Sequence, residues 1–168
     1  MFYLKKNGLT LVLLIVYSRP LALCKKNTVK KKIKTKNSYF IELPVISEKN
    51  RGNLCFGEIK KQIPFDIKRF YYIFDVPPKT NRAQHAHKTT KQVLFCINAL
   101  VRIKLDDGVN KDEIILSKPN EGIFLGEMLW TEVTNFQRDT ILLVLASDFY
   151  KENDYIRDYK IFKEYFKK

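Results

Sequence analysis

The sequence VRIKLDDGVNKDEIILS, residues 101–117, shows most clearly how this chain folds. Its first five residues alternate in character, because Val101, Ile103 and Leu105 are apolar whereas Arg102 and Lys104 are charged. This alternation is typical of a β-strand with one buried side and one side facing solvent. The acidic turn DDG then leads into a second strand, DEIILS, so the stretch predicts an antiparallel hairpin.

Short apolar runs separated by turn signals continue on both sides of this hairpin. They are SYFIELPVI (38–46), NLCFGEI (53–59), RFYYIFDV (69–76), IFLGEMLW (123–130) and TILLVLAS (140–147). The last of these is apolar throughout, which predicts a fully buried strand. Strand after strand with short turns predicts an all-β fold, either a barrel or a double-sheet roll.

The C-terminal segment has a different pattern. Aromatic residues recur there at helical spacing, at Tyr155, Tyr159, Phe162 and Phe166. Asn153 or Asp154 is a candidate N-cap, and lysines follow at the end. We therefore predict a C-terminal α-helix that packs on the barrel or on a partner subunit.

The formal net charge of +13 is unevenly distributed. Residues 1–37 contain ten of the 31 basic residues and no acidic residue, which leaves 21 basic and 18 acidic residues in the rest of the chain, a balance of +3. The body has no basic stripe interleaved with aromatic residues of the kind that nucleic-acid binding requires. We therefore exclude a nucleic-acid partner.

The basic leader, residues 1–37, is predicted to be disordered and separate from a domain at residues 38–168. Lys5 and Lys6 precede an apolar run from Leu9 to Tyr17, the layout of a signal peptide, but the run is short for a transmembrane helix. An alternative is that the leader is upstream sequence from a start codon assigned too early. Any membrane contact is expected through this leader alone.

The three cysteines, Cys24, Cys55 and Cys96, are an odd number without short spacing. This favours free thiols in a reducing compartment over a disulfide framework or a zinc site.

The stretch RAQHAHKTTKQ, residues 82–92, holds the only two histidines of the chain. Side chains two apart on a strand point to the same face, so His85 and His87 are expected to share one space. One interpretation is a metal site, but the residues that follow supply no carboxylate ligand and two lysines lie nearby. A second is acid–base catalysis at a carbon beside a carbonyl, with Arg82 binding a phosphate. A third is that both are surface residues of a hairpin.

Several long motifs together resemble the sugar-nucleotide 3,4-ketoisomerases, the WxcM-like branch of the cupin superfamily. These motifs are IPFDIKRFYYIFDVP, RAQHAHKTTKQVL, LDDG, LWTEVTNF and LVLASDFYKENDYIRDYKIF. The resemblance implies a cupin double-stranded β-helix (jelly-roll barrel) that forms a homodimer and uses no metal or organic cofactor. It also implies conversion of dTDP-4-oxo-6-deoxy-glucose to a 3-oxo isomer. Because nucleotide sugars are made in the cytosol, a cytoplasmic location follows.

The resemblance implies roles for particular residues. It makes His85 and His87 the catalytic pair. Our own hypothesis is that His87 is the carbon base and His85 its partner, and the reverse assignment is left open. The candidate substrate-binding residues are Arg82, Tyr71, Tyr72, Lys88, Gln92, Trp130 and Glu132. For Tyr71 and Tyr72, the alternative is that one of them faces the core; for Trp130 and Glu132, it is a purely structural role.

Three positions depart from the family pattern. Ala83 and Ala99 replace common glycines, which is tolerable if neither backbone needs a positive φ. Thr131 stands where the family often has His or Asn, so the stereochemistry at C4 stays open. Two other functions are retained: a cupin epimerase, which leaves the ketone in place, and a non-catalytic cupin that binds a sugar nucleotide or a glycan.

Overall fold

The computed structural model describes residues 32–77 and 79–167. The predicted signal-like run and most of the basic leader lie outside these residues. None of the helices within the described part of the chain is long and apolar enough to cross a membrane.

The hairpin predicted at residues 101–117 is present as β7 (Val101–Asp106) and β8 (Lys111–Leu116). Its inward side chains are fully buried, as the alternation predicted, whereas Lys104 is exposed. The turn is closed by carboxylates, because Asp106 accepts a hydrogen bond from the amide of Gly108 at 2.7 Å and Asp107 from that of Asn110 at 2.6 Å. Gly108 has φ 89°, and a Cβ there would lie 2.3 Å from the ring of Phe166. Glycine is therefore required at this turn.

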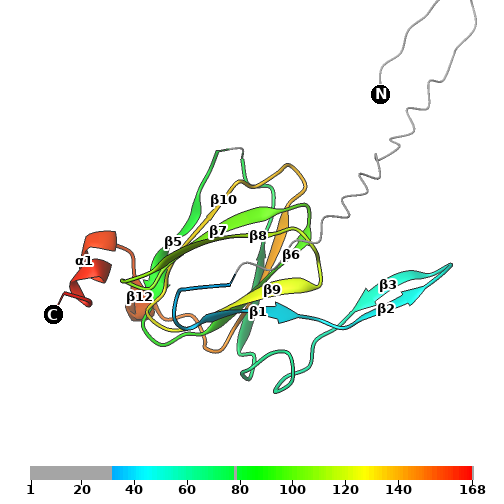
Figure 1. The fold of residues 1–168 in the computed structure, drawn as a ribbon, viewed down its shortest axis with the longest axis horizontal. Coiled ribbons are helices and arrows are strands. Elements are labelled where there is room, and N and C mark those ends of the chain that lie inside the picture. The colour runs from blue at the N-terminus through cyan, green and yellow to red at the C-terminus, as the bar shows by residue number, and fades with distance from the viewer. Residues whose placement is uncertain (1–31, 78, 168) are drawn as a thin grey trace, which may run out of the picture. The chain divides into compact units, whose positions relative to one another are not determined.

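Two five-stranded antiparallel sheets face each other (Figure 1). The first has the order β1-β9-β6-β11-β4 and the second the order β12-β5-β10-β7-β8. The strands of the first sheet are β1 (Ser38–Glu42), β9 (Glu121–Leu125), β6 (Gln92–Asn98), β11 (Ile141–Ala146) and β4 (Arg69–Ile73). The remaining strands of the second sheet are β12 (Tyr155–Ile156), β5 (Arg82–His87) and β10 (Trp130–Thr134). The prediction of an all-β jelly-roll barrel is confirmed.

The main core lies between the sheets and includes Leu105, Leu116, Ile123, Leu142 and Val133. Two smaller clusters lie on the outer faces. One packs residues 63–67 against the first sheet, and the other packs the C-terminal segment against the second.

Strand β11 differs from its prediction. Leu142, Val144 and Ala146 are buried, but Ile141, Leu143 and Leu145 are only partly buried. The strand is apolar on both sides, yet only one side faces the main core. The stretch IFLGEMLW also differs, since β9 ends at Leu125 and β10 begins at Trp130.

A two-stranded hairpin, β2 (Val45–Glu48) and β3 (Gly52–Cys55), extends away from the sheets on the side opposite to the C-terminal helix (Figure 1). Its apolar side chains Val45, Ile46 and Leu54 are exposed.

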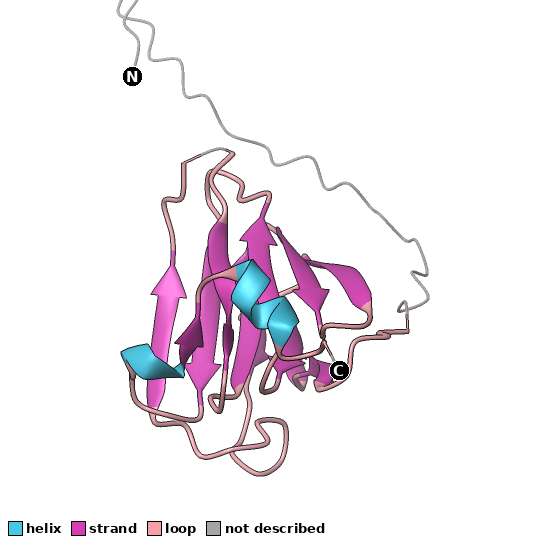
Figure 2. Ribbon diagram, turned by 90° about the vertical axis from the view of Figure 1, so that its left-hand side faces the viewer, coloured by secondary structure: helices cyan, strands magenta, loops and turns pink. Residues whose placement is uncertain are grey.

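The C-terminal helix α1 (Tyr159–Glu164) is shorter than predicted. Its N-cap is Asp158, whose side chain accepts hydrogen bonds from the amides of Lys160 and Ile161. Asp154 instead ends the 3-10 turn η1 (Glu152–Asp154), and Tyr155 begins β12. The predicted cap and the first residue of the aromatic stripe are therefore wrong as helix assignments. The helix does lie across the second sheet (Figure 2), where Phe162 is fully buried.

Residues 34–36, on the leader side of the predicted boundary, are tied into the domain. Asp112 accepts hydrogen bonds from the amides of Lys34 and Thr35 at 2.7 Å, and Asp107 accepts one from the amide of Lys36 at 2.6 Å. The chain is thus anchored at the β7–β8 hairpin before β1 begins.

Candidate active site

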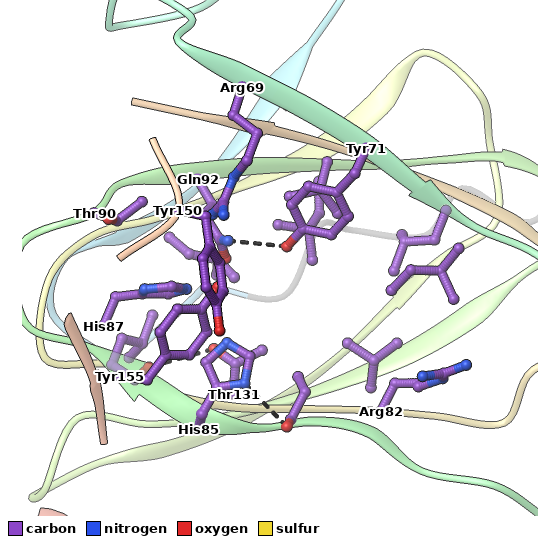
Figure 3. A pocket seen from close by; sticks show the side chains of 18 of the residues that line it. Arg69, Tyr71, Arg82, His85, His87, Thr90, Gln92, Thr131, Tyr150 and Tyr155 are labelled. Atoms are coloured by element: carbon purple, nitrogen blue, oxygen red, sulfur yellow. Dashed lines mark hydrogen bonds between the residues drawn. The ribbon is translucent and has the colours of Figure 1, made fainter. Parts of the chain in front are cut away.

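A cavity of about 440 Å³ lies between the sheets, with residues of β4, β5, β6, β10, β11 and β12 in its wall. Its lining combines apolar core residues with two histidines, three tyrosines and three arginines. Figure 3 shows most of these side chains, with both histidines labelled. A concave, largely apolar space with a few converging polar groups is the usual form of a small-molecule site.

Strand β5 supplies the central side chains through a β-bulge. Thr131 pairs with His85 and Glu132 pairs with Ala83, so Gln84 has no partner on β10. Ala83 and Gln84 both have a positive φ, 66° and 55°. Bulges of this kind redirect the strand beside functional sites. Here the bulge places the carbonyl of Ala83 3.0 Å from Nδ1 of His85.

The condition set for the two alanine departures is not met. Ala83 and Ala99 were expected to be tolerated only if neither backbone needs a positive φ, and both adopt one, Ala99 at 60°. A residue with a Cβ is strained in this left-handed region, whereas glycine is not.

His85 and His87 line the same cavity, with ring centroids 4.9 Å apart and planes nearly perpendicular. The prediction that they share one space is confirmed. Burial lowers the pKa of His85 to about 4, even though the hydrogen bond to the Ala83 carbonyl acts in the opposite direction. His85 is therefore neutral at pH 7, with Nδ1 donating to the carbonyl.

His87 lies deeper, with only 5% of its surface exposed. Its Nδ1 is 2.8 Å from Oδ2 of Asp154, and its buried Nε2 has no hydrogen-bond partner among the described residues. Burial lowers the pKa of His87 against the opposing effect of this carboxylate. Burial would raise the pKa of Asp154, but hydrogen bonds from Thr90, His87 and Thr89 hold it well below its usual range.

The cavity wall includes five polar residues that the sequence analysis did not propose for the site. They are Arg69, Thr90, Tyr150, Tyr155 and Arg157. The Arg69 guanidinium lies 5.4 Å from the ring of Tyr71, and that of Arg157 lies 4.4 Å from the ring of Tyr155. Tyr155 in turn packs against both histidine rings, at 4.8 and 4.4 Å.

Glu152 holds Arg157 through two hydrogen bonds of 3.0 Å and also accepts one from the hydroxyl of Tyr150. The signal for this group was present in LVLASDFYKENDYIRDYKIF, but the aromatic spacing favoured a continuous helix there.

Five of the nine predicted site residues line the cavity: Arg82, Tyr71, His85, His87 and Gln92. Gln92 donates a hydrogen bond of 3.1 Å to the hydroxyl of Tyr71. Their roles stay predictions.

The structure does not bring the other four into the cavity. Tyr72 faces the opposite side of β4 and is 57% exposed. Lys88 is exposed and donates to the carbonyl of Asn153 at 2.8 Å. Trp130 packs against Tyr159 and Phe162 and donates to Glu132 at 3.2 Å.

The reason is the two-residue period of a strand. Neighbours on β4 and on β10 point to opposite faces, so Tyr71 and Thr131 reach the cavity whereas Tyr72 and Trp130 do not. Trp130 and Glu132 therefore lie outside the cavity wall, which agrees with the structural alternative, and their roles stay predictions.

The described residues contain no group of three or more histidine, cysteine or acidic side chains that could hold a metal ion. Cys55 and Cys96 are free thiols, and burial raises the pKa of Cys96 to about 11.

The comparisons with known proteins agree with one another. A family model described as "WxcM-like, C-terminal" (FdtA) matches residues 36–167. The chain is similar to TDP-4-oxo-6-deoxy-alpha-D-glucose-3,4-oxoisomerase of Aneurinibacillus thermoaerophilus, with 48% identity over 119 residues. The match covers 71% of this chain and 86% of that protein.

Two solved structures are also similar. A 3,4-ketoisomerase from Helicobacter canadensis shares 46% identity with a TM-score of 0.74, covering 77% of this chain and 96% of that one. The second is the 3,4-ketoisomerase QdtA from Thermoanaerobacterium thermosaccharolyticum, as an asparagine-for-histidine mutant in complex with TDP-4-keto-6-deoxyglucose. It shares 39% sequence identity with a TM-score of 0.75, and the match covers 77% of this chain and 94% of that one.

Proposed function

The chain belongs to the WxcM-like family, and from that membership we propose that it is a 3,4-ketoisomerase of TDP-linked 4-oxo-6-deoxy sugars. The reaction moves the keto group from C4 to C3. The observation that carries the assignment to this cavity is the pair of neutral histidine rings, each with Nδ1 on an acceptor, which leaves Nε2 of each ring able to accept a proton.

The reaction is a pair of proton transfers on each side of an enediol. The C3 proton is acidified by the adjacent C4 carbonyl, and a histidine removes it while the carbonyl oxygen O4 gains a proton. Reprotonation at C4, with loss of the proton from O3, leaves a ketone at C3. We assign His87 as the carbon base and His85 as the partner that relays protons between O3 and O4.

Three arginines in the cavity wall fit the diphosphate of a nucleotide sugar. Arg69, Arg82 and Arg157 come from β4, β5 and the segment after β12. Guanidinium groups match phosphate oxygens in geometry and charge. Nε of Arg69 is buried without a hydrogen-bond partner in the described part of the chain, so it is available to a ligand.

The sugar is expected to lie at the histidine end, where Tyr71, Gln92 and Thr131 supply polar groups. Thr131 is buried and pairs with His85 across the strands. We propose that this position presents one face of C4 for protonation, so its side chain sets the C4 configuration of the product.

A homodimer is part of this proposal. The outer face of the first sheet carries exposed aromatic and aliphatic side chains, Phe70, Tyr72, Phe74 and Ile97. Apolar patches of this kind mark interaction sites. Phe70→Glu is expected to weaken self-association at least ~10²-fold, because a charge would have to be desolvated; sedimentation at several concentrations would detect it. A dimer that persists unchanged would remove this face from the interface.

We also propose that the reaction takes place in the cytoplasm, where nucleotide sugars are made. Mass spectrometry of the protein from cells tests this through its N-terminus. An intact leader agrees with the proposal, whereas cleavage after export would contradict it.

The central experiment follows the full chain with TDP-4-oxo-6-deoxy-glucose in deuterated buffer by proton NMR. We expect a 3-oxo product with deuterium at C4, and a rate at least ~10²-fold lower for His87→Asn. If His85→Asn abolishes C3 proton loss and His87→Asn does not, the two roles are reversed.

The same spectra separate the other functions. A product with an inverted stereocentre and its ketone still at C4 would identify an epimerase. Binding without any conversion would identify a non-catalytic sugar-nucleotide module.

A further inference from the structure

Asp154 makes more contacts with the end of β5 than a surface carboxylate would. Its Oδ2 lies 2.8 Å from Nδ1 of His87, and its Oδ1 accepts hydrogen bonds from the amide and the hydroxyl of Thr89, both at 2.8 Å. Its carbonyl accepts the amide of Lys88 at 2.9 Å. Only 6% of the residue is exposed. The carboxylate is therefore fixed in position relative to the imidazole.

A carboxylate is only an acceptor, so the group facing it must be a donor. Nδ1 of His87 therefore carries the proton in the neutral ring, and Nε2 has the free lone pair. When Nε2 accepts a proton, the resulting imidazolium lies beside a negative charge at hydrogen-bond distance, which stabilises it.

His85 has a different partner. Its Nδ1 faces the carbonyl of Ala83, which fixes the same tautomer but carries no net charge. Both rings therefore have an Nε2 that can accept a proton. Only the imidazolium of His87 would then lie beside a negative charge.

Other charged and titratable groups near His87 do not replace Asp154. From the surrounding elements, Arg69 and Arg157 act against a positive imidazole, and the rings of His85 and Tyr155 pack against it without a counter-charge. Asp154 is the acidic group among the described residues that contacts the ring.

We propose that Asp154 is the positioning residue of His87, which keeps the proton on Nδ1 and stabilises the imidazolium that forms when Nε2 takes a proton from substrate carbon. This inference rests on the proposed ketoisomerase function for its catalytic half. Its structural half concerns the free protein and is tested separately. Related histidine–carboxylate pairs lose on the order of 10²–10⁴-fold in rate when the carboxylate is neutralised.

The first test is the tautomer of each ring, measured by long-range ¹H–¹⁵N NMR on the full chain at pH 7 without ligand. Because the chain has only two histidines, the spectrum contains two ring systems, and His85→Asn assigns them. We expect His87 to be neutral with its proton on Nδ1. A proton on Nε2 would overturn the proposal, and this result needs neither activity nor an altered Asp154.

The second test compares Asp154→Asn with Asp106→Asn. Asp106 is a matched control, since it is similarly buried and anchors the C-terminal segment through the hydroxyl of Tyr159 at 2.5 Å, away from both histidines. We expect Asp154→Asn to reduce kcat ~10²–10⁴-fold, to disturb the His87 tautomer alone and to leave the affinity for TDP within about threefold. Asp106→Asn is expected to lower stability without changing either ring.

Each outcome of the second test decides the proposal. A kcat for Asp154→Asn within threefold of the unaltered enzyme would refute it, and so would a parallel loss of TDP affinity, which would make Asp154 merely structural. If Asp154→Asn fails to fold, the tautomer in the unaltered protein decides. If the unaltered protein turns over no TDP sugar, the proposed function fails while the tautomer result still stands.

Discussion

The two faces of the first sheet have similar amino acids but different surroundings. On β4, Arg69, Tyr71 and Ile73 line the cavity, whereas Phe70 and Tyr72 point outward and are exposed. Tyr71 is bonded to Gln92 and lies against Arg69. Residue type alone therefore does not assign a strand residue to a site, whereas its position in the two-residue period does.

Strand β11 shows the same difference between the two faces with aliphatic residues. Leu142 is fully buried in the main core, whereas its neighbour Leu143 is partly buried on the outer face. Residues of the same chain cover the inner face, and we propose that a second copy of the chain covers exposed side chains of the outer face.

The largest expected difference between the faces is in stability. Leu142→Ala should reduce the free energy of unfolding by about 2–5 kcal/mol, because it leaves a cavity in the main core. Leu143→Ala should cost less, and its cost should depend on protein concentration if a second copy covers it. Urea denaturation at two concentrations measures both. Equal losses of stability that do not depend on protein concentration would contradict a difference between the two faces of the sheet.

The pH dependence of stability isolates the inner face, because both histidines of the chain are there. With the folded pKa of His85 at about 4 and the unfolded value near 6.5, the unfolded chain binds more protons between these values. The contribution of this group to the free energy of unfolding should therefore be fully present above pH 6.5 and be lost as the pH drops through 4, by at most about 3.4 kcal/mol.

His85→Gln is the control for this titration, measured as the free energy of unfolding at pH 7 and at pH 5. It should make the profile less steep, with the remaining slope expected from His87, whose pKa is also lowered by burial. A profile as steep as that of the unaltered protein would assign the dependence to other groups.

Tyr71 and Tyr72 are neighbours on opposite faces of β4, so their substitution compares the effect of each face on catalysis. Tyr71→Phe removes a hydroxyl that is bonded in the cavity, which should lower kcat/KM roughly 2–10-fold, the value of one hydrogen bond. Tyr72→Phe removes an exposed hydroxyl and should leave kcat/KM unchanged. A loss of kcat/KM in Tyr72→Phe alone would instead indicate that Tyr72 contributes to the active site.

The smallest effects are expected at the strained alanines. Ala83→Gly and Ala99→Gly should each raise the free energy of unfolding by about 0.5–1 kcal/mol, because relief of left-handed strain exceeds the entropy that glycine adds to the unfolded chain. Thermal unfolding measures the gain. Ala83→Gly alone should also change KM, since the carbonyl of Ala83 holds His85; identical kinetics for both variants would argue against this coupling.

Much of this architecture could be predicted from local pattern. Alternation predicted the β7–β8 hairpin, and the His-x-His spacing predicted that both rings share one space, because each depends only on neighbours along one strand. The pattern of strands and turns predicted a barrel or a double-sheet roll, and the motif resemblance narrowed this to the jelly-roll barrel and indicated the family.

Contacts across long sequence separations were not predictable in this way. Asp154 satisfies the local criteria of a helix cap, yet it bonds His87, 67 residues earlier. Arg69 and Arg157 enter the cavity only because β4 and β12 pair with β11 and β5. The bulge at Gln84 likewise depends on its register with β10.

The distance along the chain between His87 and Asp154 also sets an order of events during biosynthesis. The ribosome makes about 5–20 residues per second, so Asp154 is added roughly 3–13 s after the histidine that it contacts. Strands β4 and β1 likewise wait for β11 and β9, since each pairs with a strand far downstream. A nascent chain that stops short of η1 would therefore carry both imidazoles but lack the carboxylate, and the contact between His87 and Asp154 can form only after η1 has been translated.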